Sequence, residues 1–115
     1  MVQPGEIYMA ELGSAGLHPV IIVSRESLNR GRYALVVPCT SSRFALRSQV
    51  SNCVPFRAGE FGFTKDCVAQ CENMLSIDLM LLDIETGPRG VLDHESLRNV
   101  VKAIGYVIES DCEPS

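Results

Sequence analysis

The chain has 115 residues, of which 46% are hydrophobic and 21% charged, and it carries a formal net charge of −4. These values suit a single globular domain with a modest core, and no apolar run is long enough to cross a bilayer. The first six residues lack the basic and apolar parts of a signal peptide, so we expect a cytoplasmic protein without membrane association.

The charge is unevenly distributed along the chain. Residues 25–57 contain six arginines and one acidic residue, whereas residues 58–115 contain four basic and eleven acidic residues. An arginine-only basic window in an acidic chain is the pattern of a local phosphate-binding surface. A loop-rich surface with solvated arginines gives the same pattern, so charge alone leaves both interpretations open.

Five cysteines in a chain without an export signal indicate reduced thiols. Cys67 and Cys71 are four residues apart, and no histidine follows at the spacing of a zinc finger. We therefore expect no metal site and no cofactor, and we interpret the two cysteines as strand residues that share one face.

The first forty residues predict three strands, at residues 6–12, 19–24 and 33–39. Pro19 biases the residue before it, His18, towards an extended conformation. The second and third strands are rich in β-branched residues, and the turn between them ends at Gly31 after one turn of helix. An antiparallel pairing of these strands would bring His18 and Thr40 to the same edge of the sheet.

The remainder of the chain predicts shorter strands and one helix. We expect a mobile loop at residues 43–47, strands at residues 48–56 and 63–74, and a short strand at residues 91–92. Asp93 is the expected N-cap of a helix. The apolar face of that helix would dock on the sheet through six residues: Leu97, Val100, Val101, Ile104, Val107 and Ile108.

These elements predict one domain at residues 1–110, followed by a disordered tail at residues 111–115. The fold class is mainly β with an α addition: five to seven short strands form a compact half-open barrel, and the helix covers it. Asp66 and Glu72 lie in a mostly apolar stretch, so each needs a partner, such as an arginine of the basic window, unless it faces water.

Four stretches of sequence follow one another in an order that resembles a known family. Residues 4–8 read Pro-Gly-Glu-Ile-Tyr, and residues 18–24 read His-Pro-Val-Ile-Ile-Val-Ser. Residues 36–42 read Val-Val-Pro-Cys-Thr-Ser-Ser, and residues 62–78 begin Gly-Phe-Thr-Lys-Asp-Cys-Val and end Ser-Ile-Asp. No single stretch is specific, but the ordered series spans nearly the whole chain and resembles the MazF/PemK/Kid-type toxins.

The resemblance implies the small SH3-like plug barrel known as the CcdB/MazF-like fold, usually as a homodimer. It also implies the toxin of a type II toxin-antitoxin pair, a metal-independent and sequence-selective endoribonuclease (mRNA interferase) that acts on single-stranded RNA. The implied partners are RNA and a cognate antitoxin with an acidic segment. The implied catalytic residues are His18 and Thr40, and the implied RNA-binding residues are Ser41, Ser42, Arg43, Arg47, Gln70 and Glu72.

Three positions depart from the family pattern. His18, Gln70 and Leu75 stand where the family has arginines. Metal-free RNA cleavage needs an acid, a base and positive charge near the phosphoryl oxygens, and histidine exchanges protons near neutral pH. His18 could therefore replace an arginine in the chemistry. A degenerate module that binds an antitoxin, RNA or a DNA topoisomerase without cleavage remains the alternative, as does a structural β domain unrelated to toxins.

Overall fold

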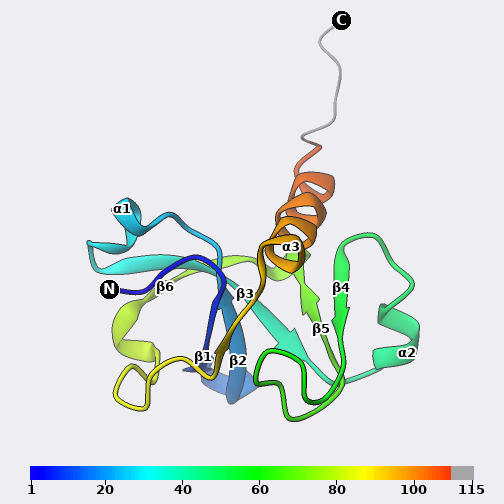
Figure 1. Ribbon diagram of the computed structural model, residues 1–115, viewed down its shortest axis with the longest axis horizontal. Coiled ribbons are helices and arrows are strands. Elements are labelled where there is room, and N and C mark those ends of the chain that lie inside the picture. The colour runs from blue at the N-terminus through cyan, green and yellow to red at the C-terminus, as the bar shows by residue number, and fades with distance from the viewer. Residues whose placement is uncertain (110–115) are drawn as a thin grey trace, which may run out of the picture.

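The computed structural model describes residues 1–109, so the expected tail at 111–115 lies outside the described residues. Its strands and helices follow the order shown in Figure 1. The strands are β1 (Glu6–Glu11), β2 (Leu17–Ile22), β3 (Tyr33–Thr40), β4 (Cys53–Phe56), β5 (Cys67–Gln70), β6 (Leu75–Asp78) and β7 (Gly90–Val91). The α-helices are α1 (Glu26–Asn29), α2 (Phe44–Arg47) and α3 (His94–Val107), and the 3-10 turns are η1 (Gly13–Ala15), η2 (Cys71–Asn73) and η3 (Leu79–Leu81).

The seven strands form one curled antiparallel sheet. Its strand order is β4-β5-β3-β2-β1-β7, and β6 pairs with the first half of β3 while β5 pairs with its end. Helix α3 lies over one side of the sheet, beside β4 and η2 (Figure 1). This half-barrel with a C-terminal helix confirms the predicted fold class.

The two central strands are buried on both faces. Ile21 and Val37 point into a core that α3, β4 and β5 close, whereas Val20 and Val36 point into a second core under β6. Side chains alternate between the faces of a strand, so a strand covered on both sides must be apolar throughout. This explains why the two continuous apolar runs of the sequence mark the centre of the fold.

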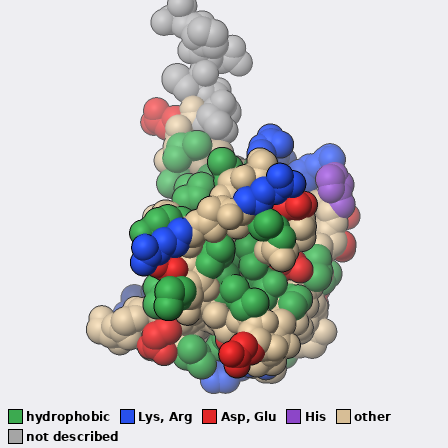
Figure 2. All heavy atoms as spheres, turned by 90° about the vertical axis from the view of Figure 1, so that its left-hand side faces the viewer, with side chains coloured by type: hydrophobic (Ala, Val, Ile, Leu, Met, Phe, Trp, Pro, Cys, Tyr) green, Lys and Arg blue, Asp and Glu red, His purple; other side chains and the backbone are tan. Residues whose placement is uncertain are grey.

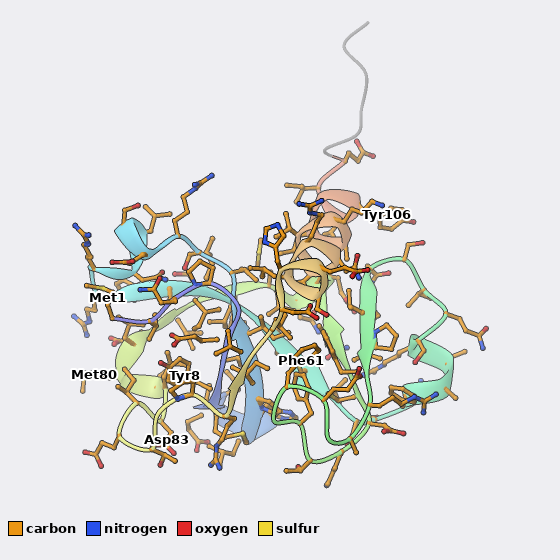
Figure 3. The ribbon with its side chains drawn as sticks, viewed as in Figure 1. Met1, Tyr8, Phe61, Met80, Asp83 and Tyr106 are labelled. Atoms are coloured by element: carbon orange, nitrogen blue, oxygen red, sulfur yellow. The ribbon has the colours of Figure 1, made fainter. Side chains whose placement is uncertain are left out.

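Helix α3 begins as predicted but uses only part of its apolar face. The Asp93 carboxylate accepts a hydrogen bond from the backbone N–H of Ser96 at 2.8 Å, so Asp93 is the N-cap. Val100 is fully buried, and Leu97 and Ile104 pack against the first core. The prediction was wrong for Val101, which faces away from the sheet between the buried Val100 and Ala103. It was also wrong for Val107 and Ile108, which are exposed at the end of the helix near Tyr106 (Figure 3).

Three other expectations need correction. Within the mobile loop expected at residues 43–47, Phe44–Arg47 form the helical turn α2, with Arg43 as its N-cap. The strand expected at 48–56 is only β4, because the backbone N–H groups of Ser48, Gln49 and Val50 bond back to the carbonyls of α2. The strand expected at 63–74 is only β5, because a tight turn precedes it and η2 follows it. Cys71 therefore lies in η2 rather than in a strand, although it shares the first core with Cys67.

A buried asparagine holds the turn between β2 and β3. The side-chain N–H groups of Asn29 donate to the carbonyl oxygens of Val2 at 3.1 Å and Ser24 at 2.9 Å, and its oxygen accepts from the Ser24 hydroxyl. The Ser24 oxygen in turn accepts from the backbone N–H of Leu35 at 3.0 Å. This network links the N-terminus, α1 and β3.

Replacing Asn29 with alanine should therefore lower the free energy of unfolding by about 2–3 kcal/mol, because the buried Val2 and Ser24 carbonyls and the Ser24 hydroxyl lose their partners. Urea unfolding measures the change. Ser27→Ala, at an exposed position of the same turn, is the control and should change stability by less than about 0.5 kcal/mol. Equal midpoints for the two variants would contradict this role of Asn29.

One side of the molecule exposes a group of apolar side chains. This side carries α1, the start of β3 and η3, and Figure 2 shows apolar side chains gathered at its centre with charged ones around them. The exposed large side chains of these elements are Leu28, Tyr33, Leu35, Met80 and Leu81.

Among the described residues, no helix is both long and apolar enough to span a membrane.

Candidate functional site

The sheet brings His18 and Thr40 together at one edge, as predicted. β2 and β3 pair antiparallel with Val20 opposite Pro38, so the same register extended by two residues sets His18 opposite Thr40. Thr40 pairs in turn with Val68 on β5, which makes Gln70 its diagonal neighbour. Directly paired residues point to the same face of a sheet, so the positions of His18, Thr40 and Gln70 share one face.

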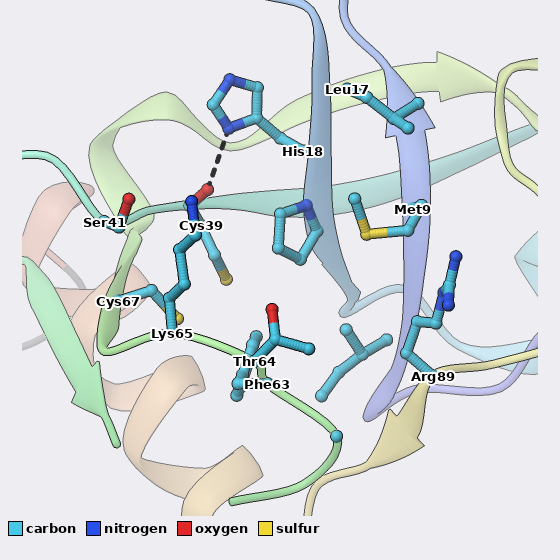
Figure 4. Close-up of a pocket in the computed structure, with 13 residues that line it drawn as sticks. Met9, Leu17, His18, Cys39, Ser41, Phe63, Thr64, Lys65, Cys67 and Arg89 are labelled. Carbon is cyan, nitrogen blue, oxygen red and sulfur yellow. Dashed lines mark hydrogen bonds between the residues drawn. The ribbon is translucent and has the colours of Figure 1, made fainter. Parts of the chain in front are cut away.

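Both ring nitrogens of His18 contact backbone carbonyls. Nδ1 lies 3.2 Å from the carbonyl oxygen of Cys39 on β3, and Nε2 lies 2.8 Å from the carbonyl oxygen of Ala15 in η1. A carbonyl oxygen only accepts hydrogen bonds, so the neutral ring donates to one of the two and the doubly protonated ring donates to both. His18 thus ties the loop before β2 to the end of β3 (Figure 4).

The residues after β3 form a constrained turn. The Thr40 hydroxyl oxygen accepts a hydrogen bond from the backbone N–H of Ser42 at 3.2 Å. Arg43 has a φ of 53°, in the left-handed region that non-glycine residues seldom adopt, and α2 begins directly after it. The Arg57 guanidinium stacks over the Phe44 ring at 4.9 Å from the centroid, which fixes α2 against β4.

The other predicted residues gather around the start of β4. Gln70 pairs with Cys53, and the side-chain amide of Asn52 donates to the Glu72 carboxylate at 2.8 Å. Burial raises the pKa of the Cys53 thiol, the Glu72 charge raises it further, and the Arg47 charge lowers it. Arg47, Gln70 and Glu72 therefore form a second polar group at the start of β4, and Gln70 connects it to Thr40.

A cavity of about 400 Å³ opens at the same edge, and its lining includes His18 and the residues next to it on the opposite face, Pro19 and Cys39. Its walls are mostly apolar, and its lining includes polar groups from four segments: His18, Ser41, Thr64, Lys65 and Arg89 (Figure 4). The sequence did not single out Thr64, Lys65 or Arg89. Arg89 lies in the Gly-Pro-Arg-Gly break before β7, so its place in the cavity depends on a contact between distant segments.

About half of the basic window is neutralised by ion pairs. Arg32 pairs with Asp78 at 2.7 Å, Arg57 with Asp66 at 3.0 Å, and Arg30 with Glu26 at 3.6 Å. The Ala58 N–H and the Arg57 guanidinium lower the pKa of Asp66, so this carboxylate finds the arginine partner that the sequence suggested.

Four cations beside the candidate site have no such partner. Within residues 1–109, no carboxylate lies within salt-bridge distance of Arg43, Arg47, Lys65 or Arg89. In the same range, no three histidine, cysteine or acidic side chains are placed to share a metal ion.

Comparisons with known proteins show the family and the fold of this chain. The model of the PemK-like, MazF-like toxins of type II toxin-antitoxin systems matches residues 3–108. A Mycobacterium tuberculosis toxin, MazF-mt6, has a similar structure with a TM-score of 0.75 and 25% sequence identity; the match covers 90% of this chain and 96% of that one. No curated protein sequence gives a match.

Two further solved structures are more distant in sequence and share the fold. An endoribonuclease in complex with its cognate antitoxin from a mycobacterial species has a TM-score of 0.78 at 19% identity, covering 99% of this chain and 100% of that one. MazF from Deinococcus radiodurans has a TM-score of 0.74 at 16% identity, covering 94% and 96%. The family model covers nearly the whole chain, and this protein therefore belongs to the PemK-like, MazF-like toxins of type II toxin-antitoxin systems.

Proposed function

We propose that this toxin is a metal-independent, sequence-selective endoribonuclease that cleaves single-stranded RNA. The observation that carries the proposal is the contact of the His18 ring with the Cys39 carbonyl beside Thr40, at the neighbouring ends of β2 and β3, within a domain of this family. Two of the structural neighbours are endoribonucleases by name, and the proposal extends that activity to this chain.

The proposed chemistry uses the RNA itself as the nucleophile. The 2′-hydroxyl attacks the adjacent phosphorus, a base takes its proton, and an acid donates a proton to the leaving 5′-oxygen. His18 is proposed to carry out one of these proton transfers. The Thr40 oxygen already accepts from the Ser42 N–H, which leaves its own proton free for a phosphoryl oxygen.

His18 must exchange one partner to act on RNA. Ala15, which contacts Nε2, is the last residue of the short turn η1 and is followed by Gly16, whereas Cys39, which contacts Nδ1, is buried in β3. We therefore propose that RNA displaces the Ala15 carbonyl and leaves the Cys39 contact intact. Catalytic hydrogen bonds often form only in the complex with substrate.

The unpaired cations define the proposed path of the RNA backbone. Ser41, Ser42, Arg43 and Arg47 follow Thr40 directly, and Lys65 and Arg89 stand at the cavity on the other side of the edge. Gln70 and Glu72 are proposed to shape the end of this path beside Arg47. The apolar cavity walls suit an unstacked base, since proteins bind single-stranded RNA by pairing phosphate contacts with base stacking.

RNA binding tests this path. Arg47→Ala and Lys65→Ala should each weaken binding several-fold and reduce the slope of log affinity against log salt by about 0.7, the contribution of one phosphate contact on a single strand. Filter binding at several salt concentrations gives both values. Lys102→Ala, which removes an exposed cation from α3, is the matched control and should leave the slope unchanged. RNA affinity that does not respond to salt would contradict the proposal.

A module that binds without cleavage is the second candidate. The observation that favours it is that both His18 ring nitrogens already contact backbone carbonyls, at a position where the family has an arginine. In that case the same surface would hold RNA or an acidic partner peptide, and no product would form.

The proposed partners besides RNA are a cognate antitoxin and a second copy of this chain. An antitoxin with an acidic segment would complement the unpaired Arg43, Arg47, Lys65 and Arg89. A homodimer would bury apolar side chains that the single chain leaves exposed, such as those on η3 and the free end of α3.

A further inference from the structure

Two cysteines lie side by side in the wall of the cavity. Cys39 on β3 pairs with Ala69 on β5, and Cys67 lies two residues before Ala69 on β5. The side chains of Cys39 and Cys67 are therefore diagonal neighbours on one face of the sheet. Both belong to the first core and both line the cavity (Figure 4). Neither takes part in a disulfide.

The two thiols interact directly and differ in acidity. A hydrogen bond with the Cys39 thiol lowers the pKa of Cys67, and this effect outweighs both burial and the Asp66 charge. The same hydrogen bond and burial raise the pKa of Cys39. Diagonal neighbours on adjacent strands lie about 7–8 Å apart, so closing a disulfide here requires β3 and β5 to draw together at this point.

Among the cysteines of residues 1–109, Cys67 is the only one whose pKa is lowered. Burial raises the pKa of Cys53, and burial raises that of Cys71 to about 12. The thiolate is the form of cysteine that reacts with peroxides. Cys67 is therefore the expected nucleophile, with Cys39 in place as the second thiol.

We propose that Cys39 and Cys67 form a peroxide-sensitive pair that closes into a disulfide inside the cavity. The Cys67 thiolate attacks one oxygen of hydrogen peroxide, the O–O bond breaks, and Cys67 becomes a sulfenic acid with release of hydroxide. The Cys39 sulfur then attacks the Cys67 sulfur, the S–O bond breaks, and a second hydroxide leaves. In total, both sulfurs are oxidised and the peroxide is reduced. The two hydroxides combine with the two thiol protons to give two molecules of water.

This site is chemically independent of the proposed ribonuclease activity. Cys39 and Cys67 are only 1% and 4% exposed, so peroxide would approach them from inside the cavity, which both residues line. The bond would join β3 to β5 directly beside Thr40, and the carbonyl of the same Cys39 holds the His18 ring. Oxidation would therefore change the end of β3, which separates the cavity from the face that carries His18 and Thr40.

Peptide mapping after treatment with hydrogen peroxide tests the proposal on the full, unmodified chain. The expected result is an intact mass lower by two hydrogen atoms and one linked peptide pair that joins Cys39 to Cys67, both reversed by dithiothreitol. A disulfide that uses Cys71 or Cys112, a bond between two chains, or four described cysteines that stay reduced would each overturn it.

Variants then separate the roles of the two thiols. Cys67→Ser should slow the loss of free thiol at least about tenfold, because it removes the reactive thiolate. Cys39→Ser should stop the reaction at a sulfenic acid on Cys67, which dimedone traps. Cys53→Ser, outside the cavity, is the matched control and should react as the unchanged chain does. Unchanged kinetics in Cys67→Ser would contradict the assignment, whatever the activity towards RNA.

Discussion

Replacing His18 with alanine is expected to slow RNA cleavage by at least about 100-fold, the usual loss when a proton-transfer group is removed. His18 is half-buried at the sheet edge and makes its two contacts with backbone carbonyls, so the core does not depend on it. The cleavage rate of a labelled single-stranded RNA measures the effect, and the urea midpoint verifies that the variant is folded.

The chain contains a matched control for this experiment. His94, the other histidine, is exposed on α3, where its Nε2 lies 3.0 Å from an Arg98 nitrogen, and His94→Ala should leave the rate within about twofold. His18→Asn separates chemistry from positioning, because the asparagine amide can still donate to the Cys39 carbonyl but cannot transfer protons at neutral pH. Full activity in His18→Asn would show that His18 only positions the strand end.

Replacing Gly90 with alanine is expected to lower the free energy of unfolding by more than about 3 kcal/mol, the range reached when a buried close approach is blocked. A Cβ at Gly90 would lie 1.8 Å from the Phe61 carbonyl oxygen and 2.5 Å from its carbon. Both atoms are backbone, so no side chain can rotate away. The reverse contact exists at Gly62, whose added Cβ would lie 2.0 Å from the Arg89 carbonyl oxygen.

Gly31→Ala is the control for this close approach. The nearest atom to an added Cβ at Gly31 is the Leu28 carbonyl oxygen at 3.7 Å, which is an ordinary contact. Neither Gly31 nor Gly90 has a positive φ, so the comparison isolates the effect of the clash between the added Cβ and its neighbours. Urea unfolding of both variants gives the difference, and similar midpoints would mean that the segments at residues 61–62 and 89–90 do not touch in solution.

The centre of the fold could be predicted because its signals are local. Two apolar runs rich in β-branched residues, joined by a turn with Asn29 and Gly31, indicate the β2-β3 pair without any knowledge of the rest. The antiparallel pairing of β2 with β3 is confirmed from Ile22 opposite Val36 to Val20 opposite Pro38, two residues short of His18 and Thr40. The N-cap at Asp93 is equally local and was also predicted correctly.

The elements that were predicted wrongly depend on packing between distant segments. The apolar spacing of α3 predicts one docking face, but the sheet ends before Val107 and Ile108, so these side chains find no neighbour there. The turn at α2 also carries the contact of Arg57 with the Phe44 ring, which no local pattern reveals.

The site was predicted in part for the same reason. His18 and Thr40 lie on adjacent strands, but the cavity with Lys65 and Arg89 exists because the chain at Gly62 meets the chain at Gly90. The sequence also could not show which arginines are ion-paired, because Arg32 pairs with Asp78, 46 residues further along the chain. The only sign of this close backbone approach in the sequence was the pair of glycines that flank Pro88 and Arg89.

The most direct test of the proposed function is to incubate the purified, folded protein with a long single-stranded RNA in the presence of a chelator and to map the ends of the products. We expect discrete cuts at a short sequence, with 5′-hydroxyl ends from attack by the 2′-hydroxyl, and loss of those cuts in His18→Ala. Intact RNA in the presence of folded protein would contradict the nuclease proposal and would identify the protein as a binding module of the toxin family.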